Sequence, residues 1–122
     1  MKNLKLKIDI DKRSYGFALQ IVKLVRSFPK ETAGFEIGKQ LLRSGTSIAA
    51  NIEEAQGAFS KADFIYKMNT ALKEARETNF WLRLVKDSRL MINSKGLGDL
   101  IKESVEVKNI LASIVKSSKR NK

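Results

Sequence analysis

Apolar residues recur at every third or fourth position through most of the chain, a period that is typical of amphipathic helices. The pattern is interrupted at the single proline, Pro29, after Gly57 and around residues 93–96. The chain is therefore predicted to form four helices, over about 12–28, 35–56, 60–89 and 97–116. Because short connections favour antiparallel neighbours, the predicted fold is all-α, an antiparallel up-down four-helix bundle.

Each predicted helix carries one apolar stripe that we assign to the core. The stripes contain Phe17, Ile21, Leu24, Val25 and Phe28; Ile37, Leu41, Ile48, Ile52 and Ala55; Phe64, Met68, Ala71, Leu72, Ala75, Thr78, Leu82 and Val85; and Leu97, Leu100, Ile101, Val107, Leu111 and Ile114. Gly45 falls inside the second helix, where glycine costs about 1 kcal/mol relative to alanine, so we expect it to permit a close backbone approach. Ser60, with Asp63 three residues later, predicts an N-cap.

The two ends of the chain differ from this helical pattern. Residues 4–10 alternate strictly between apolar and polar, which predicts an extended arm over 1–11. This arm is expected either to lie on the bundle or on a neighbouring subunit, or to pair with an equivalent arm. Residues 117–122 are predicted to be a basic, frayed tail. The whole chain, 1–122, has the length of one domain.

Charge is the property that most restricts the partners. The 122 residues include 24 Lys and Arg against 13 Asp and Glu, a net charge of +11 that favours polyanions. The excess avoids residues 34–59. No apolar run reaches the roughly 18–20 residues of a membrane span, so we expect a cytoplasmic protein with no membrane partner.

The composition argues against most catalytic chemistry. The chain has no His and no Cys, which removes the usual nucleophiles, bases and transition-metal ligands. We expect no enzymatic activity, no metal and no cofactor. One enzymatic alternative is a hard metal ion bound by Glu53, Glu54, Glu74 and Glu77, although helical glutamates without a His partner are usually solvated or paired.

A polar stripe adjoins the apolar stripe of the second helix. It consists of Gln40, Ser44, Ser47, Asn51 and Glu54. Buried polar groups need hydrogen-bond partners, so the stripe predicts a polar seam within or between subunits, with Arg76 and Glu77 as partners. The alternative is a ligand-binding face.

A second apolar strip lies on the third helix, roughly opposite its core stripe. It consists of Tyr66, Phe80 and Leu84, with Trp81 at its edge. Exposed strips of this kind commonly mark partner surfaces, so it is interpreted either as an oligomer interface or as the surface that the arm covers.

Basic residues at helical spacing are the candidates for nucleic-acid binding. They are Lys12, Lys23, Arg26, Lys30, Arg76, Arg83, Lys86, Lys95, Lys102 and Lys116. Each stripe taken alone is typical of a solvated surface, but together they favour electrostatic binding of RNA or DNA. The chain has no motif that indicates base-specific recognition.

The second and third helices carry a pattern that resembles a known family. Arg43, Ser47, Ile48, Asn51, Ile52 and Glu54 fit Arg-x-x-x-Ser-Ile-x-x-Asn-Ile-x-Glu, and residues 73–82 fit one branch of it. The family consists of small four-helix-bundle proteins first described from open reading frames in intervening sequences of bacterial 23S rRNA genes. Ala49 and Ala55 stand where many members have proline and glycine. The likeness covers about residues 12–116.

The resemblance implies a homopentamer without enzymatic activity. It also implies a relationship to accessory proteins of diversity-generating retroelements, which bind nucleic acid and a reverse transcriptase. Our first hypothesis is a basic homo-oligomeric scaffold that binds RNA or DNA through the backbone, with the ribosome and its RNA as one setting. The alternative is an adaptor for an acidic protein partner.

Overall fold

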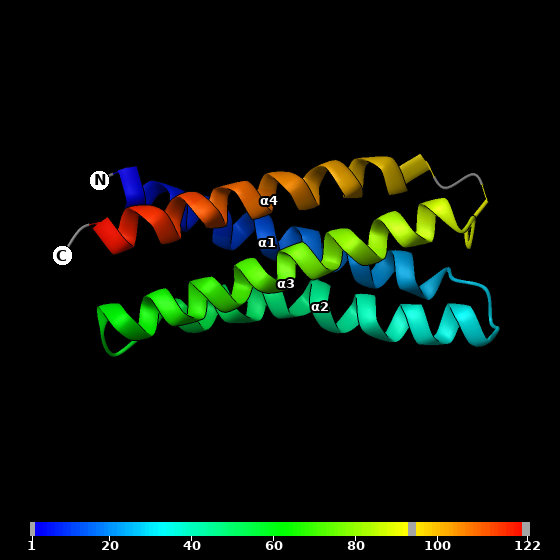
Figure 1. The fold of residues 1–122 in the computed structure, drawn as a ribbon, viewed down its shortest axis with the longest axis horizontal. Helices are drawn as coiled ribbons and strands as arrows, with labels where there is room; N and C mark the ends of the chain where they lie inside the picture. The colour runs from blue at the N-terminus through cyan, green and yellow to red at the C-terminus, as the bar shows by residue number, and fades with distance from the viewer. Residues whose placement is uncertain (1, 93–94, 121–122) are drawn as a thin grey trace.

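The computed structural model describes residues 2–92 and 95–120, and these residues form four helices. The helices are α1 (Lys2–Arg26), α2 (Thr32–Gln56), α3 (Lys61–Asp87) and α4 (Lys95–Arg120). They run up, down, up and down, and the start of α1 and the end of α4 lie at the same end of the bundle (Figure 1). Each helix packs against two neighbours, α1 and α3 both lying against α2 and α4. The predicted antiparallel four-helix bundle is confirmed.

The extended arm predicted over 1–11 is wrong for residues 2–11, which belong to α1. Ile10 is fully buried and lies four and seven residues before Ser14 and Phe17, which are also buried. The core stripe of α1 therefore extends further toward the N-terminus than the sequence indicated. Alternating residues also include pairs four apart, such as Leu6 and Ile10, so the same pattern is compatible with a helix. Met1 lies outside the described residues.

Local signals explain where α2 and α3 begin and end. The chain turns around Pro29, as predicted, but α1 already ends at Arg26 and α2 starts at Thr32, both earlier than expected. Ser60 caps α3, because its side chain accepts a hydrogen bond of 3.1 Å from the Asp63 amide. After α3, Arg89 adopts a left-handed conformation (φ 57°) and the Leu90 amide donates to the carbonyl five residues earlier. This Schellman-type closure ends the helix slightly earlier than expected.

The fourth helix is longer than the sequence predicted. The frayed tail expected over 117–122 is wrong for residues 117–120, which α4 includes. Val115 and Ser118 are buried near this end, so packing against the bundle holds the last turn. Lys95 and Gly96 of the expected connection belong to α4, whereas residues 93–94 and 121–122 lie outside the described part of the chain.

The core follows the predicted stripes closely. The largest fully buried side chains include Ile21, Leu41, Ile48, Leu82 and Leu111. Four predicted core residues are only half-buried at the edges of the core, and these are Val25, Ile37, Phe64 and Ile101. The close approach predicted at Gly45 is confirmed, because a Cβ atom there would lie 2.8 Å from Ile21 Cγ2.

Candidate functional site

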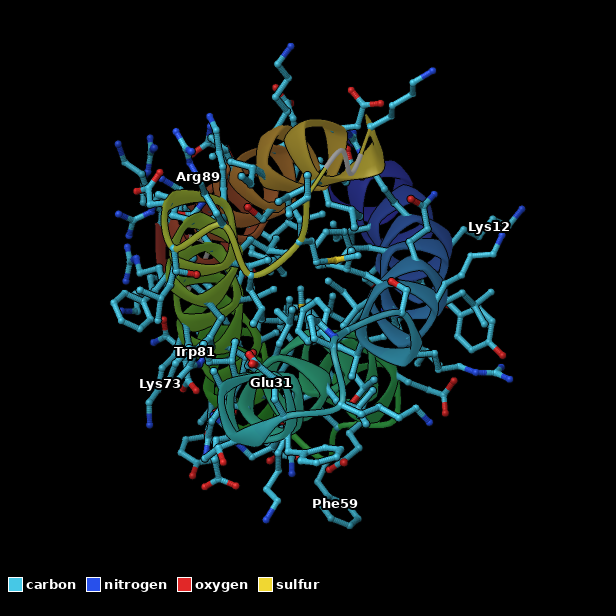
Figure 2. The ribbon with its side chains drawn as sticks, turned by 90° about the vertical axis from the view of Figure 1, so that its right-hand side faces the viewer. Lys12, Glu31, Phe59, Lys73, Trp81 and Arg89 are labelled. Atoms are coloured by element: carbon cyan, nitrogen blue, oxygen red, sulfur yellow. The ribbon has the colours of Figure 1, made fainter. Side chains whose placement is uncertain are left out.

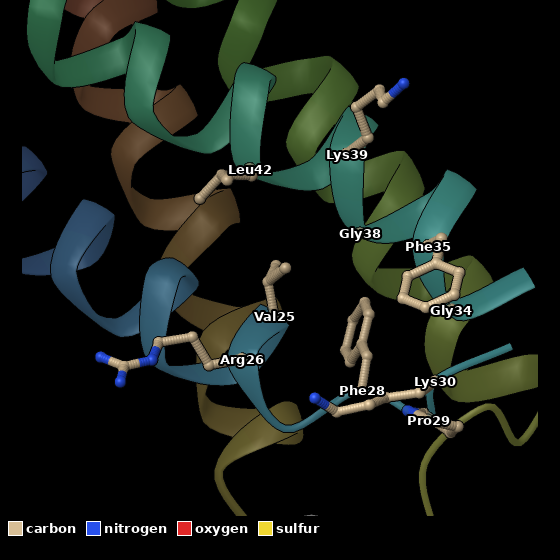
Figure 3. A pocket seen from close by; sticks show the side chains of 10 residues that line it. All are labelled: Val25, Arg26, Phe28, Pro29, Lys30, Gly34, Phe35, Gly38, Lys39 and Leu42. Atoms are coloured by element: carbon tan, nitrogen blue, oxygen red, sulfur yellow. The ribbon is translucent and has the colours of Figure 1, made fainter.

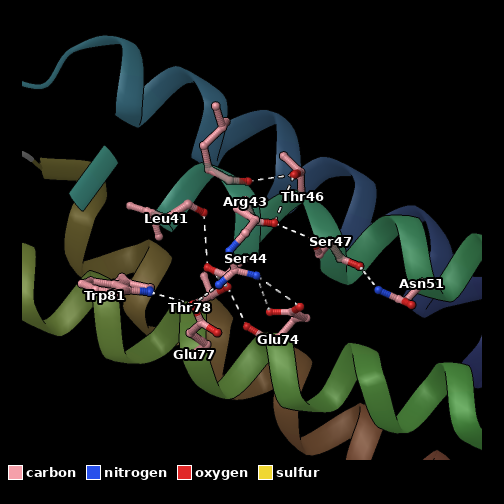
Figure 4. Close-up of polar contacts among 11 residues, drawn as sticks. Leu41, Arg43, Ser44, Thr46, Ser47, Asn51, Glu74, Glu77, Thr78 and Trp81 are labelled. Carbon is pink, nitrogen blue, oxygen red and sulfur yellow. Dashed lines mark hydrogen bonds and ion pairs between the residues drawn. The ribbon is translucent and has the colours of Figure 1, made fainter. Parts of the chain in front are cut away.

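Arg43 joins α2 to α3 through two carboxylates. Its guanidinium lies 3.3 Å from Glu74 Oε1 and also forms an ion pair with Glu77 (Figure 4). Glu77 Oε2 in addition accepts a hydrogen bond of 3.0 Å from the Trp81 indole N–H. The cluster is half open to solvent, with 46% of the Arg43 side chain exposed. It fastens the middle of α2 to α3 from the outside of the bundle.

Beneath this cluster, two buried hydroxyl groups connect the same helices. Thr78 Oγ1 lies 3.0 Å from Ser44 Oγ and 2.8 Å from the Glu74 carbonyl oxygen. Both side chains are fully buried, and within the described residues no buried side-chain nitrogen or oxygen atom lacks a partner. Ser44 is therefore part of a satisfied contact inside the chain.

The rest of the polar stripe also makes contacts inside the chain. Ser47 Oγ donates to the Arg43 carbonyl at 2.6 Å, and Asn51 Nδ2 donates to the Ser47 carbonyl at 2.8 Å. Glu54 accepts a hydrogen bond of 2.8 Å from Lys67 Nζ on α3, and Gln40 is half-buried. These contacts favour the interpretation of the stripe as a structural seam.

The two partners predicted for this seam have different positions. Glu77 contacts Arg43 and Trp81 rather than a member of the stripe. Arg76 is exposed on α3, so its pairing with the seam stays a prediction for contacts between subunits. The sequence missed Arg43 as the residue that pairs with α3, because the helical period alone does not show which helix faces a charged residue.

Two ion pairs outside the cluster raise the pKa of their cations. Hydrogen bonding to the Glu54 carboxylate, followed by its charge, raises the pKa of Lys67 above its ordinary value. Arg13 forms a two-armed contact of 2.6 and 2.8 Å with Glu103, which connects α1 to α4 and raises the pKa of Arg13. Both groups remain charged at neutral pH.

All ten candidate nucleic-acid-binding residues are exposed. In the described part of the chain, the ion pairs use Arg13, Arg43 and Lys67, so none of the ten has a carboxylate partner there. Arg83 donates to the Asn79 side chain at 2.9 Å. Lys12 and Lys73 point outward from opposite sides of the bundle (Figure 2), so positive charge is not confined to one face.

The apolar strip on α3 divides into exposed and half-buried members. Tyr66, Phe80 and Leu84 are 67%, 47% and 37% exposed. Trp81 is half-buried and packs against the core, with its ring 4.9 Å from that of Phe80 in an edge-to-face arrangement. We call Tyr66, Phe80 and Leu84 the α3 ridge.

A groove between α1 and α2 was not predicted from the sequence. It has a volume of about 300 Å³, and its lining includes Ala18, Ala49 and Ala50. Tyr15 and Leu19, both more than half exposed, lie on its α1 side. The three alanines are buried, half-buried and exposed respectively, so they carry no distinct sequence signal, and the groove becomes evident only when the two helices are placed together. We call it the α1–α2 groove.

Three of the four glutamates considered for a hard metal make other contacts, and the fourth, Glu53, is exposed. Glu74 and Glu77 bind Arg43, and Glu54 binds Lys67. Among residues 2–92 and 95–120, no three His, Cys, Asp or Glu side chains are grouped so as to hold a metal ion. Within the same residues, no helix is both long and apolar enough to cross a membrane.

The fold and the exposed cations define a small basic four-helix-bundle protein whose buried polar contacts are structural. The chain belongs to the family of 23S rRNA-intervening sequence proteins, whose sequence model matches residues 6–113. A similar solved structure is the crystal structure of a protein of unknown function from the S23 ribosomal protein family of Bacteroides thetaiotaomicron VPI-5482. The two are 41% identical with a TM-score of 0.83, over 91% of this chain and 98% of that one.

No curated protein matches the chain significantly. Neither the family description nor that of the solved structure names an enzymatic activity.

Proposed function

We propose that this protein is a non-enzymatic homo-oligomeric scaffold that binds RNA or DNA through the phosphate backbone. The observation that supports this most strongly is the set of ten exposed cations without carboxylate partners in the described residues. Each cation that binds a phosphate releases condensed counterions, so affinity falls steeply as salt rises. The family description makes ribosomal RNA the first nucleic acid to test.

The helices contribute unequally to this positive surface. The ten residues lie on α1, α3, α4 and the turn after α1, and α2 supplies none of them. Across Thr32–Gln56 the sequence has two basic and three acidic residues. Beyond Lys39, near its start, α2 is therefore the helix least suited to binding phosphates and the one best suited to packing between copies of the chain.

The proposed oligomer places the α3 ridge of one copy in the α1–α2 groove of the next. The ridge lies on the exposed side of α3, so it cannot fill the groove of its own chain. Bulky side chains on one surface and alanines on the other are complementary in shape. Because the two surfaces differ, the interface is heterologous and closes into a ring when the rotation between copies allows it. This geometry suits the pentamer that the resemblance implies.

Nucleic-acid binding is tested with two triple variants of equal charge change. One replaces Lys23, Arg26 and Lys30 with Glu, and the other replaces Lys61, Lys73 and Lys119, three exposed lysines outside the ten candidates, with Glu. The first is expected to weaken binding to structured RNA and duplex DNA, and to lower the salt slope by about 0.9 for each phosphate that is no longer neutralised. The second controls for net charge. Unchanged affinity of the first variant at low salt would exclude those three residues from the binding surface.

The oligomer is tested by solution mass with complementary variants. Phe80→Glu combined with Leu84→Glu disables the ridge, and Ala49→Trp fills the groove. Each variant alone is expected to be monomeric, and their mixture to form a heterodimer, because one intact ridge and one intact groove remain. Phe59→Glu, at a fully exposed position before α3, is the matched control. A ridge variant of unchanged mass, or a mixture that stays monomeric, would refute this interface.

The alternative partner, an acidic protein, would use the same exposed cations. Nuclease treatment distinguishes the two possibilities, because a complex held through RNA or DNA falls apart when the nucleic acid is digested. A wild-type particle that ignores RNA and DNA at low salt, and retains a protein partner after nuclease treatment, would favour the adaptor.

A further inference from the structure

We propose that a groove at the turn between α1 and α2 holds one base and its phosphate from a single-stranded nucleic acid. The inference rests on the proposed function and specifies which form of nucleic acid the scaffold prefers. The groove has a volume of about 320 Å³, at the lower end of the roughly 300–1,000 Å³ of small-molecule sites. It lies beyond the α1–α2 groove, where α1 ends and α2 begins.

Two buried glycines let the turn and the end of α1 pack closely against α2 at this groove, since an added Cβ at Gly34 would clash with the Pro29 carbonyl oxygen. Gly34 and Gly38 lie one helical turn apart on α2 and line the groove, as do Phe28 and Phe35 (Figure 3). Phe28 is 7% exposed, and its ring lies beside Gly38, where an added Cβ would meet it at 3.3 Å. Phe35 is 61% exposed, so one aromatic ring is available to solvent at the wall.

Three cations surround this apolar surface. Arg26, Lys30 and Lys39 line the groove, all three are exposed, and no carboxylate is among its lining residues. In Figure 3 the charged ends of Arg26 and Lys39 point outward from the rim, and Lys30 lies on the side of the two phenylalanines. A ligand that suits this arrangement has a flat apolar part for the ring and an anionic part for the rim.

A nucleotide within a single strand has both parts. Stacking of a base on an aromatic side chain contributes affinity without sequence preference, and basic residues follow the backbone. Bases in a duplex are paired and stacked inside the helix, so they cannot reach Phe35 without being extruded. The groove therefore predicts tighter binding of a single strand than of a duplex of the same length and sequence.

The test uses a short DNA strand carrying one 2-aminopurine, whose fluorescence falls when the base stacks, and its duplex as a reference. Phe35→Ala is expected to abolish the quenching and to weaken single-strand binding about 5- to 150-fold, with duplex binding unchanged. Phe59→Ala removes a phenylalanine on another connection that is even more exposed than Phe35, and it is expected to change neither measurement. A variant with Arg26, Lys30 and Lys39 changed to Gln is expected to weaken single-strand binding and retain part of the quenching.

The outcomes separate this inference from the proposed function. If the wild type binds duplex and single strand equally and Phe35→Ala changes nothing, the groove proposal is wrong while the scaffold stands. If the wild type binds neither, both are wrong. Adenosine monophosphate that binds as tightly as the strand would assign the groove to free nucleotides and overturn the single-strand proposal. A lower particle mass for Phe35→Ala would assign the groove to an interface between copies, which also overturns it.

Discussion

Gly45→Ala is expected to destabilise the bundle by about 1–2 kcal/mol, although alanine is the better helix former. The substitution gains about 1 kcal/mol from helix propensity. The new Cβ, however, would lie 2.8 and 3.0 Å from Ile21 Cγ2 and Cγ1. Ile21 is fully buried and β-branched, so its side chain has little freedom to move away. Overpacking costs about 1–3 kcal/mol, and the upper half of this range applies at such a rigid site.

Two other helical glycines give the matched control. An added Cβ at Gly16 or Gly98 meets nothing within 4 Å, so alanine there is expected to stabilise the protein by about 0.5–1 kcal/mol. The assay is denaturant unfolding followed by circular dichroism. All variants are measured at one protein concentration, because association of folded chains raises the apparent stability.

A double-mutant cycle with Ile21→Ala tests the cause directly. Removing both γ-carbons of Ile21 leaves its Cβ, 3.2 Å away, as the nearest atom to the added methyl group. Gly45→Ala is then expected to be neutral or stabilising, so the effect of the same substitution changes sign between the two backgrounds. The steric argument is refuted if Gly45→Ala stabilises the wild type as Gly98→Ala does, or if its cost persists alongside Ile21→Ala.

Three further predictions concern polar contacts. Thr78→Val is expected to lower the free energy of unfolding by about 1 kcal/mol in denaturant unfolding. The double variant Thr78→Val, Ser44→Ala should lose less stability than the sum of the two single variants, because the two hydroxyl groups are partners. Ser60→Ala removes the cap of α3 and is expected to lower the free energy of unfolding by about 1 kcal/mol in the same assay. The raised pKa of Lys67 implies a stabilisation that is complete below its ordinary value of 10.5 and is lost as pH rises through the folded pKa. The difference in unfolding free energy between wild type and Lys67→Met should therefore stay constant from about pH 7 to pH 9 and disappear at higher pH. A difference that persists at higher pH would show that the ion pair between Lys67 and Glu54 does not cause it.

The sequence predicted features that depend on one helix alone. Ser60 was recognisable as a cap because the signal lies within four residues, and Gly45 because a mid-helix glycine carries an intrinsic cost that packing must offset. Ile10 was misassigned because four alternating apolar residues satisfy a strand period and part of a helical period. The neighbouring residues that bury Ile10 come from the rest of the bundle, and a local pattern does not contain that information.

Features that depend on two helices could not be predicted to the same extent. Arg43 was part of a recognised pattern, but its pairing with Glu74 and Glu77 depends on the register between α2 and α3. The α1–α2 groove likewise depends on the distance between two helices. Alanine is found both in cores and on surfaces, so the alanines of the sequence do not indicate a groove by themselves. The ten cations were correctly expected to be exposed, since charged residues opposite an apolar stripe have no other position in a single bundle.

The residues that define the family pattern make contacts inside this chain, and this affects how its function must be tested. Ser47 and Asn51 bond along α2, Ile48 and Ile52 are fully buried, and Arg43 fastens α2 to α3. The pattern thus specifies how α2 packs, and substitutions of its residues would change the stability of the fold and nucleic-acid binding together. Arg43→Glu would weaken nucleic-acid binding even if Arg43 touches no phosphate, because it would face two carboxylates of α3. Substitutions of exposed cations away from the pattern, such as those at the end of α1, test nucleic-acid binding without changing the packing of the bundle.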